Sequence, residues 1–207
     1  MNYTAQNSLI GTILCVNGAG IQYSWLRRMA NHTDFNTMND LAEKVAVGSE
    51  GLINLPFGNG AERMLYNKTP GAQFSNLNLN QHQQGHLFRS ALEGIAFAFA
   101  YGMEIMQEDA LNIKVVRTGN DNLFRSSIFA NTVSSLIGQP IEIYNTTGAV
   151  GAARAAVIEH GGLEDYSQSI SSIDRISEVK PIKENEVYKL AYQKWKIELQ
   201  NKLDKLN

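Results

Sequence analysis

The apolar positions along the chain follow two different spacings, and each spacing predicts a different kind of element. Short apolar or β-branched runs bounded by glycine, proline or asparagine predict strands over residues 8–16, 51–56, 114–118 and 141–144. Apolar residues three and four positions apart predict helices over residues 21–30, 34–47, 82–108, 123–137, 148–160 and 184–206. The remaining segments are predicted to be turns and loops, the longest of them 57–74 and 164–183.

The strongest helical pattern lies in the middle of the chain, over residues 82–108. Apolar residues occupy most of its circumference, so we expect other elements to cover it on most sides. Gly94 and Gly102 would each cost about 1 kcal/mol relative to alanine inside a helix, and we expect them to permit close packing instead. Four-residue spacing in the last helix predicts an amphipathic helix whose docked side chains are Val187, Ala191, Trp195, Leu199 and Leu203.

Strand, turn and helix alternate in the second half of the chain, from residue 114 to residue 160. This order implies that two strands pair in parallel through a helical crossover. Neither an internal repeat nor a linker divides the sequence. We therefore predict one α/β domain over residues 1–207.

The composition narrows the class of protein. The chain has 207 residues, of which 43% are hydrophobic and 18% charged, enough apolar material for a core. Eighteen Lys and Arg against 20 Asp and Glu leave no positive excess to bind nucleic acid or an acidic membrane. The single cysteine, Cys15, excludes an internal disulfide, and no apolar run reaches the ~20 residues that cross a bilayer. With no signal-peptide pattern at the N-terminus, the cytoplasm is the expected location.

A turn between a predicted strand and helix is the first candidate site, and its residues are Gly119, Asn120, Asp121 and Asn122. Glycine lets a backbone turn sharply and approach a ligand, and the following helix N-terminus offers free N–H groups to a phosphate or a polar ring. An ordinary turn with asparagine as turn former and cap explains the same residues. The 17–20 turn (Asn17-Gly18-Ala19-Gly20) has the same two interpretations, and close packing of strand against helix is the simpler one.

Other polar residues give weaker signals. Glu62 and Arg63 lie in a glycine-rich loop, where they could order the loop or contact a polar ligand. His82 and His86 have the i, i+4 spacing that can place two imidazoles on a metal, but no acidic or cysteine ligand stands at a suitable spacing. We therefore predict no metal site, and Cys15 is interpreted as a small buried hydrophobe.

The order of several motifs resembles the C-terminal domain of the FGGY family of carbohydrate kinases, in particular its xylulokinase-like members. The most specific piece is HLFRSALEGIAF at 86–97, which resembles the family signature at the start of a long helix. Four further segments carry the resemblance: LCVNGAGI at 14–21, GL with LPF and GAER between 51 and 63, TGNDN at 118–122 and GAVGAA at 148–153. The glycine that the family has upstream of Leu77 is Asn76 here, and only Gly119 keeps the glycine character of the adenosine motif.

The resemblance implies a ribonuclease H-like fold of the actin, hexokinase and Hsp70 superfamily, with a mixed sheet flanked by helices. It also implies an enzyme that transfers the γ-phosphoryl group of ATP, with Mg²⁺ on the phosphates, to a hydroxyl of a ketose such as xylulose. By this resemblance we expect Gly119 to contact the adenosine. Asn120, Asp121 and Asn122 are further candidates for this contact, although they do not keep the glycine character of the motif. We assign no catalytic residue in this chain, because the family's catalytic aspartate belongs to an N-terminal domain that these 207 residues do not include.

Three hypotheses stay open at this point. In the first, the chain is the nucleotide-binding half of a longer kinase and is inactive alone. In the second, it is a stand-alone, non-catalytic nucleotide-binding or assembly module of the same superfamily, and in the third, two separate polypeptides assemble into the kinase. The long apolar helix and the terminal helix could carry a homodimer contact in any of them.

Overall fold

The computed structural model describes residues 12–31, 34–108, 113, 115–156 and 174–206. Its α-helices are α1 (Ala19–Met29), α2 (Phe35–Glu43), α3 (Gln84–Glu108), α4 (Ser127–Ile137), α5 (Gly148–Ala155) and α7 (Glu186–Asp204). Its strands are β1 (Ile53–Phe57), β2 (Gly71–Ser75), β3 (Val116–Gly119), β4 (Ile141–Tyr144) and β5 (Arg175–Val179). Within the described residues there are also three 3₁₀ turns: η1 (Ser49–Gly51), η2 (Arg63–Leu65) and η3 (Asn122–Arg125).

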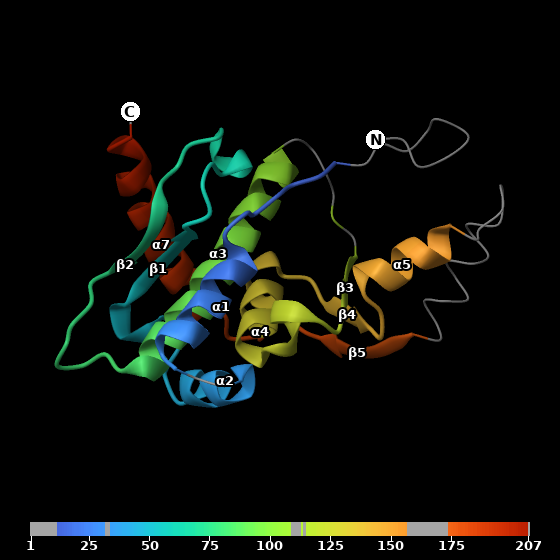
Figure 1. Cartoon of the computed structure of the whole chain (residues 1–207), viewed down its shortest axis with the longest axis horizontal. Coiled ribbons are helices and arrows are strands. Elements are labelled where there is room, and N and C mark those ends of the chain that lie inside the picture. Colours follow the sequence, from blue (N-terminus) through green and yellow to red (C-terminus); the bar gives the residue numbers. More distant parts are fainter. Residues whose placement is uncertain (1–11, 32–33, 109–112, 114, 157–173, 207) are drawn as a thin grey trace.

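Helix α3 is the central element, and α1, α2, α4 and β1 pack around it (Figure 1). The two glycines in this helix are needed for that packing, as the sequence predicts. A Cβ atom on Gly94 would overlap the carbonyl oxygen of Asn54 on β1, and one on Gly102 would overlap the side chain of Leu14. In the described part of the chain, no helix is long and apolar enough to cross a membrane.

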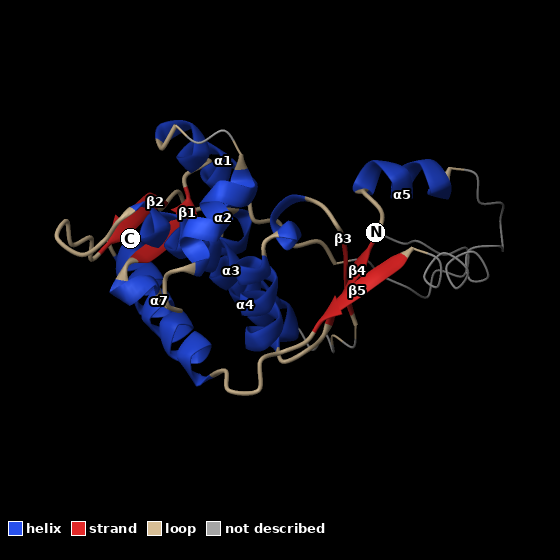
Figure 2. Cartoon of the chain, turned by 90° about the horizontal axis from the view of Figure 1, so that it is seen from below, coloured by secondary structure: helices blue, strands red, loops and turns tan. Residues whose placement is uncertain are grey.

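The described strands form two small sheets. β1 and β2 are antiparallel, with Ile53 opposite Ser75 and Phe57 opposite Gly71. In the second sheet, β4 lies between β3, to which it is parallel, and β5, to which it is antiparallel. The predicted parallel pairing and the mixed sheet are thus confirmed, and Figure 2 shows this sheet and α5 at one side of the helical body.

Two apolar cores hold the helical body together. The first joins α1, α2, α3 and α4 through Tyr23, Met38, Phe88 and Phe129. The second joins β1, α3 and α7 through Leu55, Phe57, Phe97, Trp195 and Leu199. Asp34, the first residue of the helix predicted over 34–47, is the N-cap of α2: a carboxylate oxygen of Asp34 accepts the backbone N–H of Thr37 at 2.9 Å.

Some predicted boundaries are wrong. Residues 12–16 form no strand: none of the described strands pairs with them, and Leu14 and Val16 pack on the cores as irregular chain. The helix predicted over 34–47 ends at Glu43. The helix predicted over 123–137 is divided, because η3 precedes α4 and Ser126 stands at the α4 N-cap.

Two strands lie in segments predicted to be loops. β2 overlaps the end of the loop predicted over 57–74, and its register is set by pairing with β1 rather than by its own sequence pattern. β5 falls within the polar segment 164–183 and exposes four of its five side chains, so it lacks the apolar alternation that predicts a strand. The end of the helix predicted over 148–160 lies outside the described residues.

Candidate functional site

The first candidate turn lies where β3 ends. Gly119 is the last residue of β3, and the backbone N–H of Asn120 donates to the carbonyl oxygen of Tyr144 at 2.8 Å. A Cβ atom on Gly119 would overlap the carbonyl oxygen of Thr146, so this glycine is required by packing whatever binds nearby. Asp121 has an extended backbone and precedes η3, in which Asn122 is the first residue. The predicted turn is therefore present.

A cavity of about 440 Å³ opens beside this turn, between α1, α2 and η3. Its walls come from segments far apart in sequence: Gly20, Tyr23, Ser24, Arg27, Asp34, Phe35, Asn36, Asn39, Leu123, Arg125 and Ser126. The four predicted residues 119–122 do not line this cavity. Three residues that follow them do: Leu123, Arg125 and Ser126. The sequence pattern missed Ser126 and Tyr23, since nothing in it brings α1 and α2 next to η3.

One buried polar atom in the wall of this cavity has no hydrogen-bond partner among the described residues. It is the hydroxyl oxygen of Ser126, a residue that is 4% exposed. Buried polar groups without partners are rare and costly, so a polar ligand that supplied the missing hydrogen bond would be favoured here.

The wall opposite η3 combines aromatic rings with positive charge. The rings of Tyr23 and Phe35 stack with centroids 5.6 Å apart, and the Arg27 guanidinium lies 4.6 Å from the centre of the Phe35 ring. The Tyr23 hydroxyl donates to Asn39 at 2.9 Å, and burial raises its pKa, so it stays protonated. Arg27 and Arg125 have no acidic partner among the described side chains. The cavity thus suits a flat ring system that carries negative charge.

The 17–20 turn holds the start of α1 at the edge of this cavity. The backbone N–H of Asn17 donates to a carboxylate oxygen of Glu62 at 2.9 Å, and its side chain donates to the carbonyl oxygen of Ala61 at 2.6 Å. Gly18 lies so close to β1 that a Cβ atom would overlap the carbonyl oxygen of Pro56. Among the described residues, none comes close to a Cβ atom built on Gly20, and no side chain caps the α1 N-terminus. Packing explains Gly18, as predicted, and the first N–H groups of α1 stay available to a ligand.

Of the two charged residues in the glycine-rich loop, Glu62 is 1% exposed and Arg63 is exposed. Glu62 orders the loop by binding the backbone of Asn17, which is one of the two roles predicted for it. Burial raises the pKa of Glu62, and the hydrogen bond from Asn17 opposes that shift. The ionised form of this carboxylate is therefore less favourable in the folded protein than in the unfolded chain.

Replacing Glu62 with glutamine should change the pH dependence of stability. The pKa of Glu62 is higher in the folded protein than its value of 4.5 in the unfolded chain. As pH rises from 4.5 through the folded pKa, the wild type therefore loses stability relative to the variant, which has no carboxyl group to ionise. The melting temperature of Glu62→Gln minus that of the wild type should therefore become more positive between about pH 4 and pH 8. Glu184→Gln, at an exposed carboxylate, is the control. A difference that falls with rising pH would contradict this assignment.

His82 and His86 lie together at the start of α3, with ring centroids 5.3 Å apart. One ring nitrogen of each accepts a backbone N–H, from Asn78 at 3.0 Å and from Gln83 at 3.1 Å. The Nε2 atom of His82 lies 3.4 Å from the carbonyl oxygen of Glu50. The Nε2 atom of His86 lies 3.5 Å from the carboxylate of the same residue. Both imidazoles thus cap the chain at the entry to α3. Cys15 is free and half-buried.

Comparison with known proteins gives consistent results. Residues 7–160 match the C-terminal domain of the FGGY family of carbohydrate kinases. The xylulose kinase of Haemophilus influenzae is 24% identical over 200 residues, which are 94% of this chain and 40% of that protein. This chain therefore spans about two fifths of the length of that relative.

Solved structures share the fold at low sequence identity. The xylulose kinase of Rhodospirillum rubrum superposes with a TM-score of 0.72 at 21% identity, over 88% of this chain and 38% of that one. A Plasmodium falciparum glycerol kinase with ADP superposes with a TM-score of 0.73 at 20% identity, over 89% of this chain and 37% of that one. The gluconate kinase of Lactobacillus acidophilus superposes with a TM-score of 0.68 at 20% identity, over 91% of this chain and 39% of that one. The predicted α/β fold is confirmed.

Proposed function

The chain belongs to the FGGY family of carbohydrate kinases, and we propose that it is the nucleotide-binding part of an ATP-dependent sugar kinase. Its match is to the C-terminal domain of that family. Because the chain spans about two fifths of a full-length relative, we propose that an N-terminal domain outside these 207 residues supplies the catalytic base and most sugar contacts. Sugar and ATP are then the small-molecule partners, and the cytoplasm is the proposed location.

The observation that carries this proposal is the cavity between α1, α2 and η3, with the unpartnered hydroxyl of Ser126 in its wall. We propose that the adenosine of ATP binds here. Gly119, Asn120, Asp121 and Asn122 shape the adjoining turn, and Leu123, Arg125 and Ser126 join them as proposed contacts. Tyr23 and Phe35 both line the cavity and add aromatic surface to its wall, against which a purine ring could pack.

Phosphoryl transfer depends mainly on positioning and on neutralising the charge of the phosphates. In this proposal the first N–H groups of α1 and the guanidinium of Arg27 or Arg125 hold the nucleotide in place. The hydrogen bond from Asn17 to Glu62 ties the start of α1 to the loop after β1, so the nucleotide meets a fixed surface. Mg²⁺ would come with the phosphates of ATP and neutralise part of their charge.

The sugar is proposed to be a ketose such as xylulose. The support is the similarity to a xylulose kinase over 94% of this chain. Structures similar to this one also include a glycerol kinase and a gluconate kinase, so xylulose, glycerol and gluconate form the panel to test.

A coupled assay tests whether this chain catalyses phosphoryl transfer without the proposed N-terminal domain. The chain alone, at micromolar concentration with ATP and Mg²⁺, should show no sugar-dependent ATP turnover with any member of the panel, because it lacks the proposed catalytic base. A full-length xylulose kinase is the positive control for the assay. Sugar-dependent turnover by the chain alone would contradict the proposal that catalysis requires another domain.

A further inference from the structure

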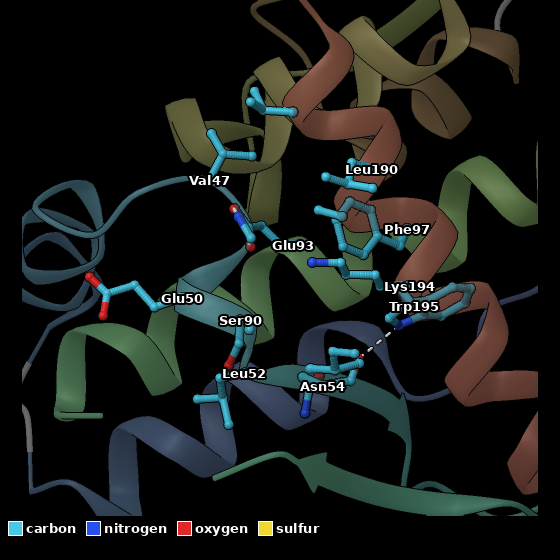
Figure 3. A pocket seen from close by; sticks show the side chains of 15 residues that line it. Val47, Glu50, Leu52, Asn54, Ser90, Glu93, Phe97, Leu190, Lys194 and Trp195 are labelled. Atoms are coloured by element: carbon cyan, nitrogen blue, oxygen red, sulfur yellow. Dashed lines mark hydrogen bonds between the residues drawn. The ribbon is translucent and has the colours of Figure 1, made fainter. Parts of the chain in front are cut away.

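The C-terminal helix α7 forms one wall of a second cavity. The buried face of this helix begins at Tyr188 and includes Trp195. Val187 therefore does not belong to the docked face, contrary to the four-residue spacing in the sequence, and it is 55% exposed. Val187 and Leu190 instead lie beside a cavity of about 360 Å³ between α7 and the segment 47–54 (Figure 3).

Most of the wall of this cavity is apolar. The apolar side chains that line it are those of Val47, Leu52, Ile53, Phe97, Val187, Leu190, Ala191 and Trp195. The polar side chains are those of Glu50, Asn54, Ser90, Glu93 and Lys194. Asn54 lies in the buried part of the wall, and the exposed Lys194 lies at the mouth. A concave, mostly apolar cavity of this size with a few polar groups is typical of sites for small organic molecules.

The charges around the cavity leave one cation available. Glu50 already accepts a hydrogen bond from Gln81 at 2.7 Å, and Glu93 accepts one from Arg89 at 2.8 Å. Among the described residues, no carboxylate forms an ion pair with Lys194. Figure 3 shows the Lys194 side chain reaching from α7 toward the opposite wall. A negatively charged group in the cavity would therefore pair with Lys194.

The buried part of the cavity also holds an unpaired acceptor. The side-chain oxygen of Asn54 has no hydrogen-bond partner among the described residues, although Asn54 is only 1% exposed. Its side-chain nitrogen donates to the carbonyl oxygen of Gln73 at 3.4 Å, and its own carbonyl oxygen accepts the N–H of Trp195 at 2.8 Å. A buried acceptor without a donor is costly, so an O–H or N–H group of a ligand that reached it would be favoured.

We propose that this cavity binds a small organic anion that has an apolar ring, a carboxylate at one end and an O–H or N–H donor at the other. The carboxylate pairs with Lys194 at the mouth, and the donor binds the side-chain oxygen of Asn54. The ring packs against Phe97 and Trp195, whose centroids are 6.1 Å apart. No residue of this cavity lines the one between α1, α2 and η3, so this site is independent of the proposed nucleotide site.

An amide chemical-shift titration of the chain with 4-hydroxyphenylacetate, which has all three features, tests this site. Saturable shifts are expected in residues 47–54 and 187–195, and none in residues 119–126. Phenylacetate lacks the hydroxyl and 4-methylphenol lacks the carboxylate, so each should bind about 2–10-fold more weakly, the effect of one hydrogen bond. The absence of saturable shifts in 47–54 and 187–195 at several millimolar 4-hydroxyphenylacetate would overturn the site. Phenylacetate that binds as tightly as 4-hydroxyphenylacetate would overturn the contact with Asn54.

Replacing Lys194 with methionine tests the contact with the carboxylate. Lys194→Met should lower the affinity for 4-hydroxyphenylacetate about 2–10-fold and leave that for 4-methylphenol unchanged, because 4-methylphenol has no charge to pair. Lys205→Met, at the exposed C-cap of α7, is the matched control and should change neither affinity. Equal weakening of both ligands by Lys194→Met, or no weakening of 4-hydroxyphenylacetate, would overturn the assignment of Lys194 to the anion.

Discussion

Replacing Trp195 with alanine is expected to lower the free energy of unfolding by about 3–5 kcal/mol. Trp195 is fully buried and lies in the core that joins β1, α3 and α7. Its ring contacts Phe97 and Tyr192 at centroid distances of 6.1 Å and 6.0 Å, and its N–H donates to the carbonyl oxygen of Asn54 at 2.8 Å. Alanine would leave a large cavity and an unpaired carbonyl on β1.

Urea denaturation monitored by circular dichroism measures this loss. The chain has a second tryptophan, Trp25 on α1, which is 45% exposed and provides the matched control. Trp25→Ala should cost about 1 kcal/mol or less, because Trp25 lies at the surface and belongs to neither apolar core. Equal losses for the two variants would contradict the arrangement in which Trp195 anchors α7 to the body.

Replacing Glu93 with alanine is also expected to lower the free energy of unfolding by about 3–5 kcal/mol. Glu93 is 2% exposed on α3, and Arg89 one turn earlier donates to it at 2.8 Å. Its carboxylate also accepts the backbone N–H of Gly48 at 3.1 Å and the hydroxyl of Ser49 at 3.0 Å. Burial raises its pKa although Arg89 favours the ionised form. Alanine would leave the Arg89 guanidinium buried without its carboxylate.

The loss extends to the turn that Glu93 holds. Ser49 and Glu50 have φ angles of 50° and 52°, in the left-handed region that side chains other than glycine disfavour. The hydrogen bonds from Gly48 and Ser49 to Glu93 keep this strained segment against α3. Without the carboxylate, the segment 48–50 should loosen, and its amide protons should exchange faster with solvent.

Chemical denaturation with two further variants separates this explanation from a general effect of lost charge. Glu186→Ala removes a carboxylate from an exposed ion pair with Lys189 and should cost about 1 kcal/mol or less. The double variant Arg89→Met with Glu93→Leu should cost less than Glu93→Ala, because it leaves no unpaired buried charge. A Glu93→Ala variant as stable as Glu186→Ala would contradict the buried pair.

Much of the fold follows from local patterns. The apolar spacing predicts α3 and α7, and the Asp34 cap predicts the start of α2. β2 and β5 could not be predicted, because hydrogen bonds to a neighbouring strand, rather than their own side chains, stabilise them. The i, i+4 spacing of Arg89 and Glu93 is visible in the sequence, but their burial depends on segment 45–49, which meets them only in the folded chain.

The candidate site could be predicted only in part. A glycine between a strand and a helix marks the turn at Gly119, and the structure contains that turn. The cavity depends on α1 and α2 meeting η3, a contact between residues about 100 positions apart. Ser126 has no sequence signal, because its significance comes from a buried hydroxyl without a partner. The sequence predicts that Glu62 orders its loop or contacts a polar ligand, but its hydrogen bond to Asn17 appears only with the tertiary structure.

The most direct test of the proposed nucleotide site is an amide chemical-shift titration of the chain with ADP. Shifts are expected in the α1 segment 20–27 and in residues 119–126, with no shifts in α7. Ser126→Ala should weaken the apparent affinity about 2–10-fold, the effect of one hydrogen bond. Ser127→Ala should leave it unchanged, since the Ser127 hydroxyl binds Glu43 at 2.6 Å outside the cavity. No shifts at several millimolar ADP, or shifts confined to other elements, would contradict the account.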